Sequence, residues 1–202
     1  MTTSIDVLPP SFYNRDPAAV ARELLGKLLV RVLDGRIMAG RIVETEAYLA
    51  TNDPASHSYG GPTARNAAMF GPPGHAYVYL IYGRYHCLNV VTEGEGIPSA
   101  VLIRAVEPLA GIDLMQARRR THRLTDLARG PGRLCEAFAL DRQLDKWDVT
   151  RGQELWCATP TSSPPLAIAV SVRIGIVSAC ALPLRFYITA SPFVSRGARI
   201  PS

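Results

Sequence analysis

Two glutamates and a tyrosine on one predicted strand are the residues best suited to acid–base chemistry. Glu44, Glu46 and Tyr48 alternate with Val43, Thr45 and Ala47 in the sequence. Side chains of a strand alternate between its two faces, so the two carboxylates and the ring should share one face and the other three residues the opposite face. One carboxylate can act as a general base only if its neighbour is committed to another partner. We interpret Glu46 as the base and Glu44 as a hydrogen-bonded scaffold; a solvent-facing acidic edge is the alternative.

Arg104 is the arginine most suited to pair with these carboxylates. It interrupts an apolar run, residues 101–103, and is followed by Ala105 and Val106, so it should be buried or point into a cleft. A buried arginine needs a carboxylate partner. Glu46 or Glu44 could serve, and the pair could hold a water; a purely structural ion pair fits the same pattern.

Tyrosines gather in a predicted hairpin further along the chain. Tyr77 and Tyr79 share a face of its first strand, and Tyr82 precedes Gly83, where the strand should turn. Flat rings can sandwich a nucleobase, and a bulky side chain on an exposed tip can replace a nucleotide extruded from a duplex. Ordinary β-propensity is the alternative for each ring taken separately.

Two further polar sites are weaker candidates. His57 could bind a ligand or only pin its loop. The glycine-rich segment 130–134 presents backbone N–H groups and Arg133 at a predicted helix start, which suits a phosphate.

The sequence predicts an α+β fold for the helices and strands that position these residues. We expect one domain over residues 1–202, with a core of about 10–195, in which a curved antiparallel sheet, a β-meander, is flanked by helices and long functional loops. Asp16-Pro17 should open a first helix that Gly26 stops, and Asp34-Gly35 should join the first two strands. The predicted strands are residues 28–33, 36–49, 75–81, 85–91 and 100–106, with 166–176 and 184–189 closing the sheet. Further helices are expected around residues 111–119 and 133–140, and residues 51–74 should form a long ordered loop without an element.

Composition narrows the chemistry. The chain has 202 residues, 48% of them hydrophobic, and a net charge of +5, which is compatible with an anionic partner but modest for one. Lys27 and Lys146 are the only lysines, so a Schiff-base lysine is not expected between them. The four cysteines form no CxxC pair, so we expect no metal and no cofactor. We see no signal peptide and no apolar run long enough to cross a bilayer, and therefore expect a cytoplasmic (bacterial nucleoid) protein with no membrane partner.

Six motifs together resemble the alkyladenine (3-methylpurine) DNA glycosylase family, monofunctional base-excision repair enzymes with a fold of their own. The motifs are RIVETEAY at 41–48, TARN with MF at 63–66 and 69–70, YVYLIYG at 77–83, LIRAVEPL at 102–109, GPGRLC at 130–135, and PLRFY with SPFVS at 183–187 and 191–195. The resemblance covers most of the chain, except for residues 113–126 and 143–165.

The resemblance implies a role for each matched residue. Glu46 would activate a water that Arg104 helps to position, and Tyr82 would be the intercalating finger. Tyr48, His57 and Tyr79 would line the pocket for a flipped base, and Asn89 would exclude the amino group of guanine. DNA contacts are expected from Arg65, Arg84 and Arg133. Arg84 departs from the apolar residue expected beside the finger.

These implications predict a monomeric glycosylase that acts on double-stranded DNA containing damaged purines. It would flip an alkylated or deaminated purine, hydrolyse the N-glycosidic bond and leave an abasic site without lyase activity. A hydrolase of free nucleosides and a non-catalytic lesion- or RNA-binding module are the alternatives.

Overall fold

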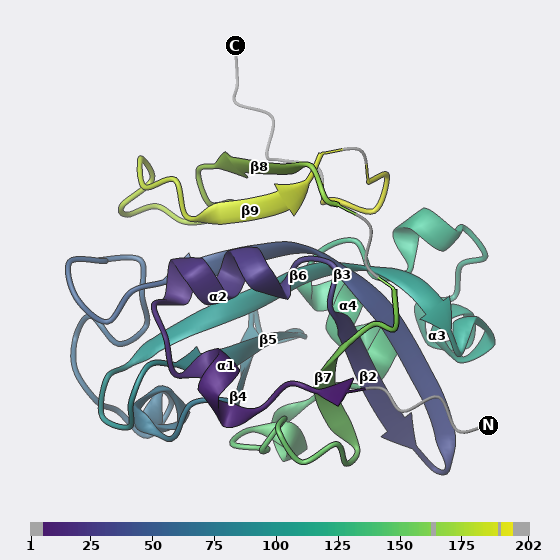
Figure 1. Cartoon of the computed structure of the whole chain (residues 1–202), viewed down its shortest axis with the longest axis horizontal. Coiled ribbons are helices and arrows are strands. Elements are labelled where there is room, and N and C mark those ends of the chain that lie inside the picture. The colour runs from purple at the N-terminus through teal and green to yellow at the C-terminus, as the bar shows by residue number, and fades with distance from the viewer. Residues whose placement is uncertain (1–5, 163–164, 190, 196–202) are drawn as a thin grey trace.

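A long antiparallel sheet organises the protein (Figure 1). The computed structural model describes residues 6–162, 165–189 and 191–195. Within these ranges, nine strands form one sheet, in the order β1-β7-β2-β3-β6-β5-β4, and the β8–β9 hairpin joins it at β3. The strands are β1 Asp6–Val7, β2 Leu28–Leu33, β3 Arg36–Tyr48, β4 Ala76–Ile81, β5 Tyr85–Thr92, β6 Ser99–Ala110, β7 Leu155–Thr159, β8 Ile168–Ser171 and β9 Arg185–Ile188. The α-helices are α1 Pro10–Tyr13, α2 Pro17–Leu24, α3 Ile112–Arg119 and α4 Pro131–Phe138, and the 3₁₀ turns are η1 Ala67–Phe70, η2 Leu124–Asp126 and η3 Arg142–Leu144. The predicted α+β class is confirmed.

Local signals set the first elements as expected. The Asp16 side chain caps α2 by accepting from the Ala19 N–H at 2.9 Å. Gly26, with φ +82°, follows the helix end. The turn between β2 and β3 holds Asp34 and Gly35 at φ 51° and 72°, the left-handed pair that a tight hairpin requires.

Strand β3 carries Glu44, Glu46 and Tyr48 and pairs with three other strands. Its first part pairs with β2, and its second part lies between β6 and β9. The pairing with β6 shifts register between Ile42 and Thr45. Val43 therefore departs from the predicted alternation: it packs with Ala105 and Phe193, whereas Ala47 belongs to the main core.

The two faces of the sheet are covered by different helices (Figure 1). On one face, α2 packs against β3 and β6, and the buried Thr45 hydroxyl donates to the Ala21 carbonyl of α2 at 2.8 Å. On the other, α4 packs against β5 and β6. Glu44 and Glu46 are also buried, although neither belongs to the apolar core.

Four predictions of elements need correction. The first is that β1, α1 and β7 were not predicted. Elements β1 and α1 are very short. Strand β7 is an apolar run without alternation, and its strand state depends on its pairing with β1 and β2. The second concerns the predicted loop 51–74, which contains the turn η1.

The other two corrections concern the end of the chain. The strand predicted for residues 166–176 ends at Ser171, because Arg173 turns to a distant partner and Gly175 has φ +77°. The late strands do not close the sheet: β8 pairs with β9, and β9 pairs with β3. No helix in the described ranges is long and apolar enough to span a membrane.

Candidate active site

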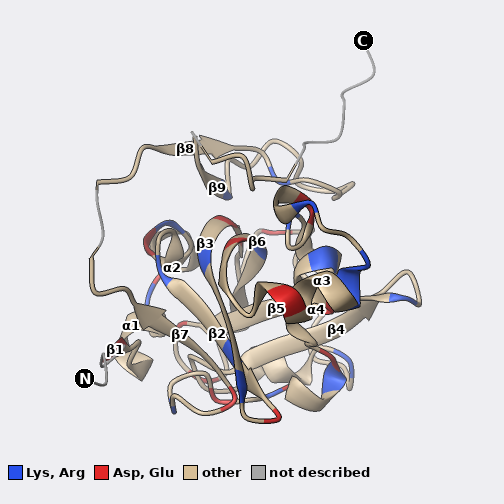
Figure 2. Cartoon of the chain, turned by 90° about the vertical axis from the view of Figure 1, so that its right-hand side faces the viewer, with Lys and Arg blue, Asp and Glu red and all other residues tan. Residues whose placement is uncertain are grey.

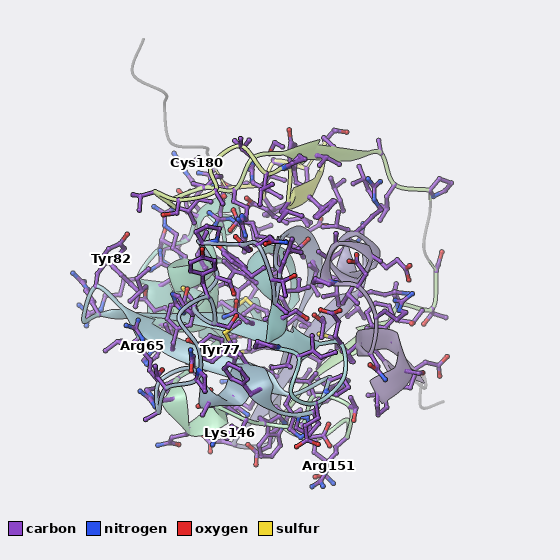
Figure 3. All side chains as sticks on the ribbon, turned by 90° about the vertical axis from the view of Figure 1, so that its left-hand side faces the viewer. Arg65, Tyr77, Tyr82, Lys146, Arg151 and Cys180 are labelled. Carbon is purple, nitrogen blue, oxygen red and sulfur yellow. The ribbon has the colours of Figure 1, made fainter. Side chains whose placement is uncertain are left out.

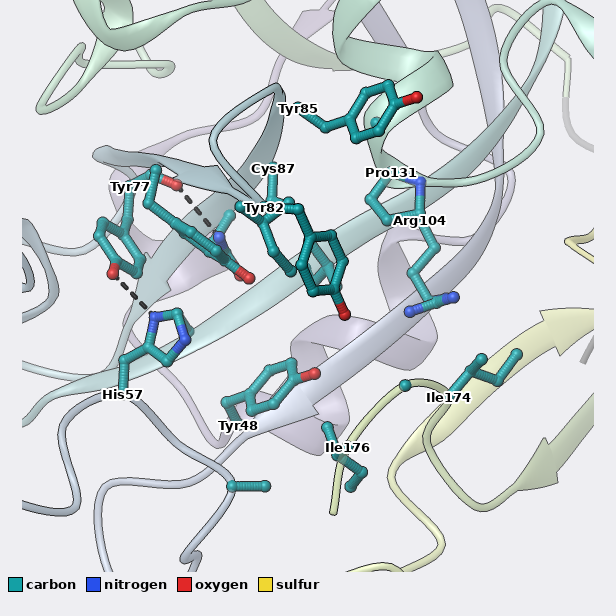
Figure 4. A pocket seen from close by; sticks show the side chains of 18 of the residues that line it. Tyr48, His57, Tyr77, Tyr82, Tyr85, Cys87, Arg104, Pro131, Ile174 and Ile176 are labelled. Atoms are coloured by element: carbon teal, nitrogen blue, oxygen red, sulfur yellow. Dashed lines mark hydrogen bonds between the residues drawn. The ribbon is translucent and has the colours of Figure 1, made fainter. Parts of the chain in front are cut away.

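A cavity of about 300 Å³ opens between the β4–β5 hairpin, the end of β3 and the start of α4 (Figure 4). Its walls are mainly aromatic and apolar side chains, with a few polar groups. The residues that line it and bear on the chemistry are Tyr48, His57, Tyr77, Tyr79, Tyr82, Cys87, Asn89, Leu102, Arg104, Pro131, Ile174 and Ile176.

Glu46 lies directly behind this wall, fully buried. One oxygen, Oε2, accepts from the Tyr48 hydroxyl at 3.0 Å and faces Nη1 of Arg104 at 3.0 Å. The other, Oε1, accepts from the main-chain N–H of Ile174 at 2.7 Å. These three partners all line the cavity, whereas Glu46 itself does not. A carboxylate has about four acceptor positions, and the described residues fill three of those of Glu46.

Glu44 has the saturated surroundings expected of a scaffold. Its Oε1 accepts from Arg104 Nε at 3.0 Å, from Arg185 Nε at 2.7 Å and from the Ser195 hydroxyl at 2.7 Å. Its Oε2 accepts from the Ser195 N–H at 2.7 Å. Arg104, only 6% exposed, thus bridges both glutamates, and the alternative of an acidic edge facing solvent is wrong.

Tyr48 is held in its neutral form. Burial raises the pKa of its hydroxyl well above the ordinary value, and the negative charge of Glu46 raises it further. The phenol therefore remains a hydrogen-bond donor to Glu46 throughout the range in which proteins function.

An aromatic wall stands across the cavity. The rings of Tyr77 and Tyr79 are stacked, with centroids 5.2 Å apart, and the His57 ring meets Tyr79 edge-on at 4.5 Å. His57 Nδ1 and the Tyr77 hydroxyl are hydrogen-bonded at 2.9 Å (Figure 4). Desolvation and the charge of Arg65 lower the pKa of His57, so the imidazole is neutral near pH 7. Burial raises the pKa of Tyr77 to about 12.

Asn89 completes the polar contacts of this wall. It is 4% exposed, and its amide donates to the Tyr77 carbonyl at 3.1 Å. That bond fixes the side chain at the edge of the cavity, where it can contact a bound ring.

Tyr82 stands at the tip of the β4–β5 hairpin and projects from the molecule (Figure 3). It is 83% exposed, with φ +53°, and Gly83 follows with φ +65°. An exposed aromatic residue in the left-handed region is unusual and carries a conformational cost. The tip thus presents a large ring to solvent at the mouth of the cavity.

The three arginines predicted to contact DNA lie close to residues of the cavity wall, although none of them lines the cavity itself. The guanidinium of Arg65 lies 5.8 Å from the Tyr79 ring centre, and that of Arg84 lies 5.3 Å from the Tyr85 ring centre. Arg133 borders a second cavity, of about 490 Å³, which also touches Arg104. Basic residues gather at α3 and the connection that follows it, beside α4 (Figure 2).

All ten predicted site residues thus lie in or around one cavity, although their roles stay predictions. Sequence reasoning missed Asp53, Arg173, Ile174, Arg185 and Ser195. Arg173 carried the same signal that identified Arg104, an arginine between apolar neighbours. The described residues hold no group of three or more His, Cys, Asp or Glu that could bind a metal ion.

Comparison with known proteins shows a match over nearly the whole chain. The model of the methylpurine-DNA glycosylase family matches residues 11–192. A protein of Methanoculleus marisnigri named "Putative 3-methyladenine DNA glycosylase" is 51% identical over 191 residues, 94% of this chain and 98% of the relative. A protein of Mesorhizobium japonicum with the same name is 52% identical over 180 residues, 89% of this chain and 86% of the relative.

Proposed function

The chain belongs to the methylpurine-DNA glycosylase family, and on that premise we propose that it flips alkylated or deaminated purines out of duplex DNA and hydrolyses their N-glycosidic bond with a water activated by Glu46. One observation carries the proposal: a fully buried carboxylate, paired with Arg104, lies behind an aromatic cavity beneath an exposed tyrosine tip. A buried charge of this kind is costly unless partners or chemistry compensate.

The reaction follows from that arrangement. As the bond from the sugar to the purine breaks, its electron pair leaves with the base and positive charge grows on the sugar. Glu46 stabilises this charge and accepts a proton from the water whose oxygen bonds to the sugar carbon. Arg104 keeps the carboxylate in place and orients the water. Each effect is worth roughly 100-fold or more in rate.

Selection of damaged bases follows from the aromatic wall. A purine alkylated at N3 or N7 is cationic in DNA, and each cation–π contact with a ring such as Tyr79 favours it by about 0.5–2 kcal/mol. Alkylation also makes the base a good leaving group, so little acid assistance is needed. Asn89, fixed by its bond to Tyr77, would exclude the amino group of guanine by steric contact.

An assay of excision from duplex DNA distinguishes the proposed glycosylase from a nucleoside hydrolase and from a non-catalytic binding module. We expect excision from a duplex that holds one hypoxanthine or 7-methylguanine, with a rate that falls as salt rises because phosphate contacts release counterions. Neither lysine lines the cavity, so the strand should remain intact until alkali is added. The measurement is a single-turnover gel assay with and without alkali, run beside free inosine.

Each alternative has its own outcome in that assay. Rapid hydrolysis of inosine without salt dependence indicates a nucleoside hydrolase. Binding of the lesion duplex with no excision indicates a non-catalytic module. A covalent adduct trapped by borohydride contradicts the water mechanism.

Tyr82→Ala tests base flipping. Without the ring, nothing fills the gap that an extruded nucleotide leaves, so we expect excision of hypoxanthine from a stable pair to fall roughly 10- to 100-fold, the equivalent of about 1–3 kcal/mol of lost stacking. Excision from a weakly paired or single-stranded context should fall less. The control is Tyr59→Ala, which removes another exposed tyrosine, one that does not line the cavity. Equal losses in both contexts would contradict the wedge role.

A further inference from the structure

A second buried ion pair lies beside the proposed catalytic carboxylate. Arg173, in the connection after β8, and Asp53, in the loop after β3, both have fully buried side chains. Their contact is bidentate: Arg173 Nη1 donates to Asp53 Oδ2 at 2.7 Å, and Nη2 donates to Oδ1 at 2.7 Å. This planar fork fixes the relative orientation of the two groups as well as their distance.

The pair joins two segments that no strand pairing connects. Asp53 accepts from the N–H groups of Leu49 and Ala55, at 3.0 and 3.2 Å, so it organises the loop that leads to His57. Arg173 Nη1 also donates to the Ala47 carbonyl at 3.0 Å. The connection lies between the end of β8 and the start of β9. Arg173 therefore anchors it to the end of β3.

Both oxygens of Glu46 contact a group that adjoins this anchor. The residue after Arg173 supplies the Ile174 N–H to Oε1 at 2.7 Å. The Arg173 guanidinium lies 4.6 Å from the ring centre of Tyr48, whose hydroxyl donates to Oε2. Arg173 thus reaches each oxygen through one intermediate, a peptide bond or a ring, without contacting the carboxylate itself.

We propose that Arg173 and Asp53 are a positioning pair for hydrolysis, which orients the Glu46 carboxylate toward its water; the inference rests on the proposed function. A tether needed only for stability could be apolar, because replacing a buried ion pair by packed apolar side chains is often neutral or stabilising. The bidentate geometry instead suits a requirement for orientation, and displacement of a reacting group by about 1 Å can cost 10²-fold in rate.

Arg31 provides a matched control. It is also a buried arginine paired with a carboxylate, at 3.4 Å from Glu154, and it donates to the Val32 carbonyl at 2.9 Å. It does not line the cavity. Substitution of Arg31 by lysine therefore tests the loss of a buried guanidinium elsewhere in the sheet.

The experiment compares Arg173→Lys, Asp53→Asn and Arg31→Lys in single-turnover excision with enzyme in excess, on duplexes that hold hypoxanthine or 7-methylguanine. For the first two variants we expect a loss of roughly 10- to 100-fold in the rate constant. For Arg173→Lys the loss should be equal for the neutral and the cationic base, because Ile174, the next residue, contacts the carboxylate. Asp53→Asn also alters the loop that leads to His57, so its loss can differ between the two bases. Affinity for a duplex with a tetrahydrofuran abasic analogue should change less than about threefold, since both side chains of the pair are fully buried. Arg31→Lys should lower the melting temperature without slowing excision.

Chemical rescue separates positioning from general destabilisation. Arg173→Ala should regain rate when guanidinium is added below denaturing concentrations, whereas ammonium at equal ionic strength should not restore it. An unchanged rate in Arg173→Lys and Asp53→Asn, or an equal slowing in Arg31→Lys, overturns the positioning role while the glycosylase function stands. An inactive parent protein overturns both.

Discussion

Glu46→Gln is expected to bind a lesion-containing duplex as tightly as the parent protein and to lose excision by a factor on the order of 10⁴. Glutamine has the same shape, and its one amide oxygen can still accept from either the Ile174 N–H or the Tyr48 hydroxyl, which contact different oxygens of Glu46. It can neither take a proton from water nor oppose positive charge on the sugar. The loss should therefore appear in the single-turnover rate constant and not in the dissociation constant.

Glu23→Gln is the control for this change. It makes the same substitution at a half-exposed glutamate on α2, whose partner is Arg15. It should retain the parent rate. Near-normal turnover of a methylated or deaminated purine by Glu46→Gln rejects the assignment of the base.

Where the sequence predicted the structure well, the deciding interactions are local. The Asp16 cap, the Asp34-Gly35 turn and the two-residue period of β3 each depend on residues within a few positions of one another. That period also placed Glu44, Glu46 and Tyr48 together. Arg104 was predicted to be buried and therefore to pair with one of the two glutamates. In the structure Arg104 pairs with both Glu44 and Glu46.

Where prediction failed, the deciding contacts are distant in sequence. Residues 172–176 have the apolar composition of a strand, but Arg173 pairs with Asp53, 120 residues away, and Ile174 donates to Glu46, 128 residues away. Strand β7 lies between β1 and β2 and pairs with both, although both are far from it in the sequence. Local sequence patterns do not predict contacts between residues so far apart. The Ile174 N–H could therefore not be identified from the sequence as a donor to Glu46.

Glu44→Gln is expected to cost about 3–5 kcal/mol in the free energy of unfolding, because removal of one partner leaves buried charges uncompensated. Arg185 would lose its ion pair, and Arg104 would keep only Glu46. The side-chain amide would also turn hydrogen atoms toward the guanidinium groups. Such a loss is a large part of the 5–15 kcal/mol that is typical of a folded domain. Urea unfolding followed by circular dichroism measures it directly.

Glu44→Gln and Glu46→Gln, two residues apart on one strand, should therefore have different effects on stability and on rate. Glu46→Gln should lose rate and retain more stability than Glu44→Gln, since Arg104 keeps Glu44 as a partner and Arg185 keeps its ion pair. Glu44→Gln should lose stability, and the fraction that remains folded should still excise at a measurable rate, because Glu46 retains its charge, Tyr48 and Ile174. If Glu44→Gln instead unfolds like the parent protein and has no excision activity, the base is Glu44, and the assignment of the two carboxylates must be exchanged.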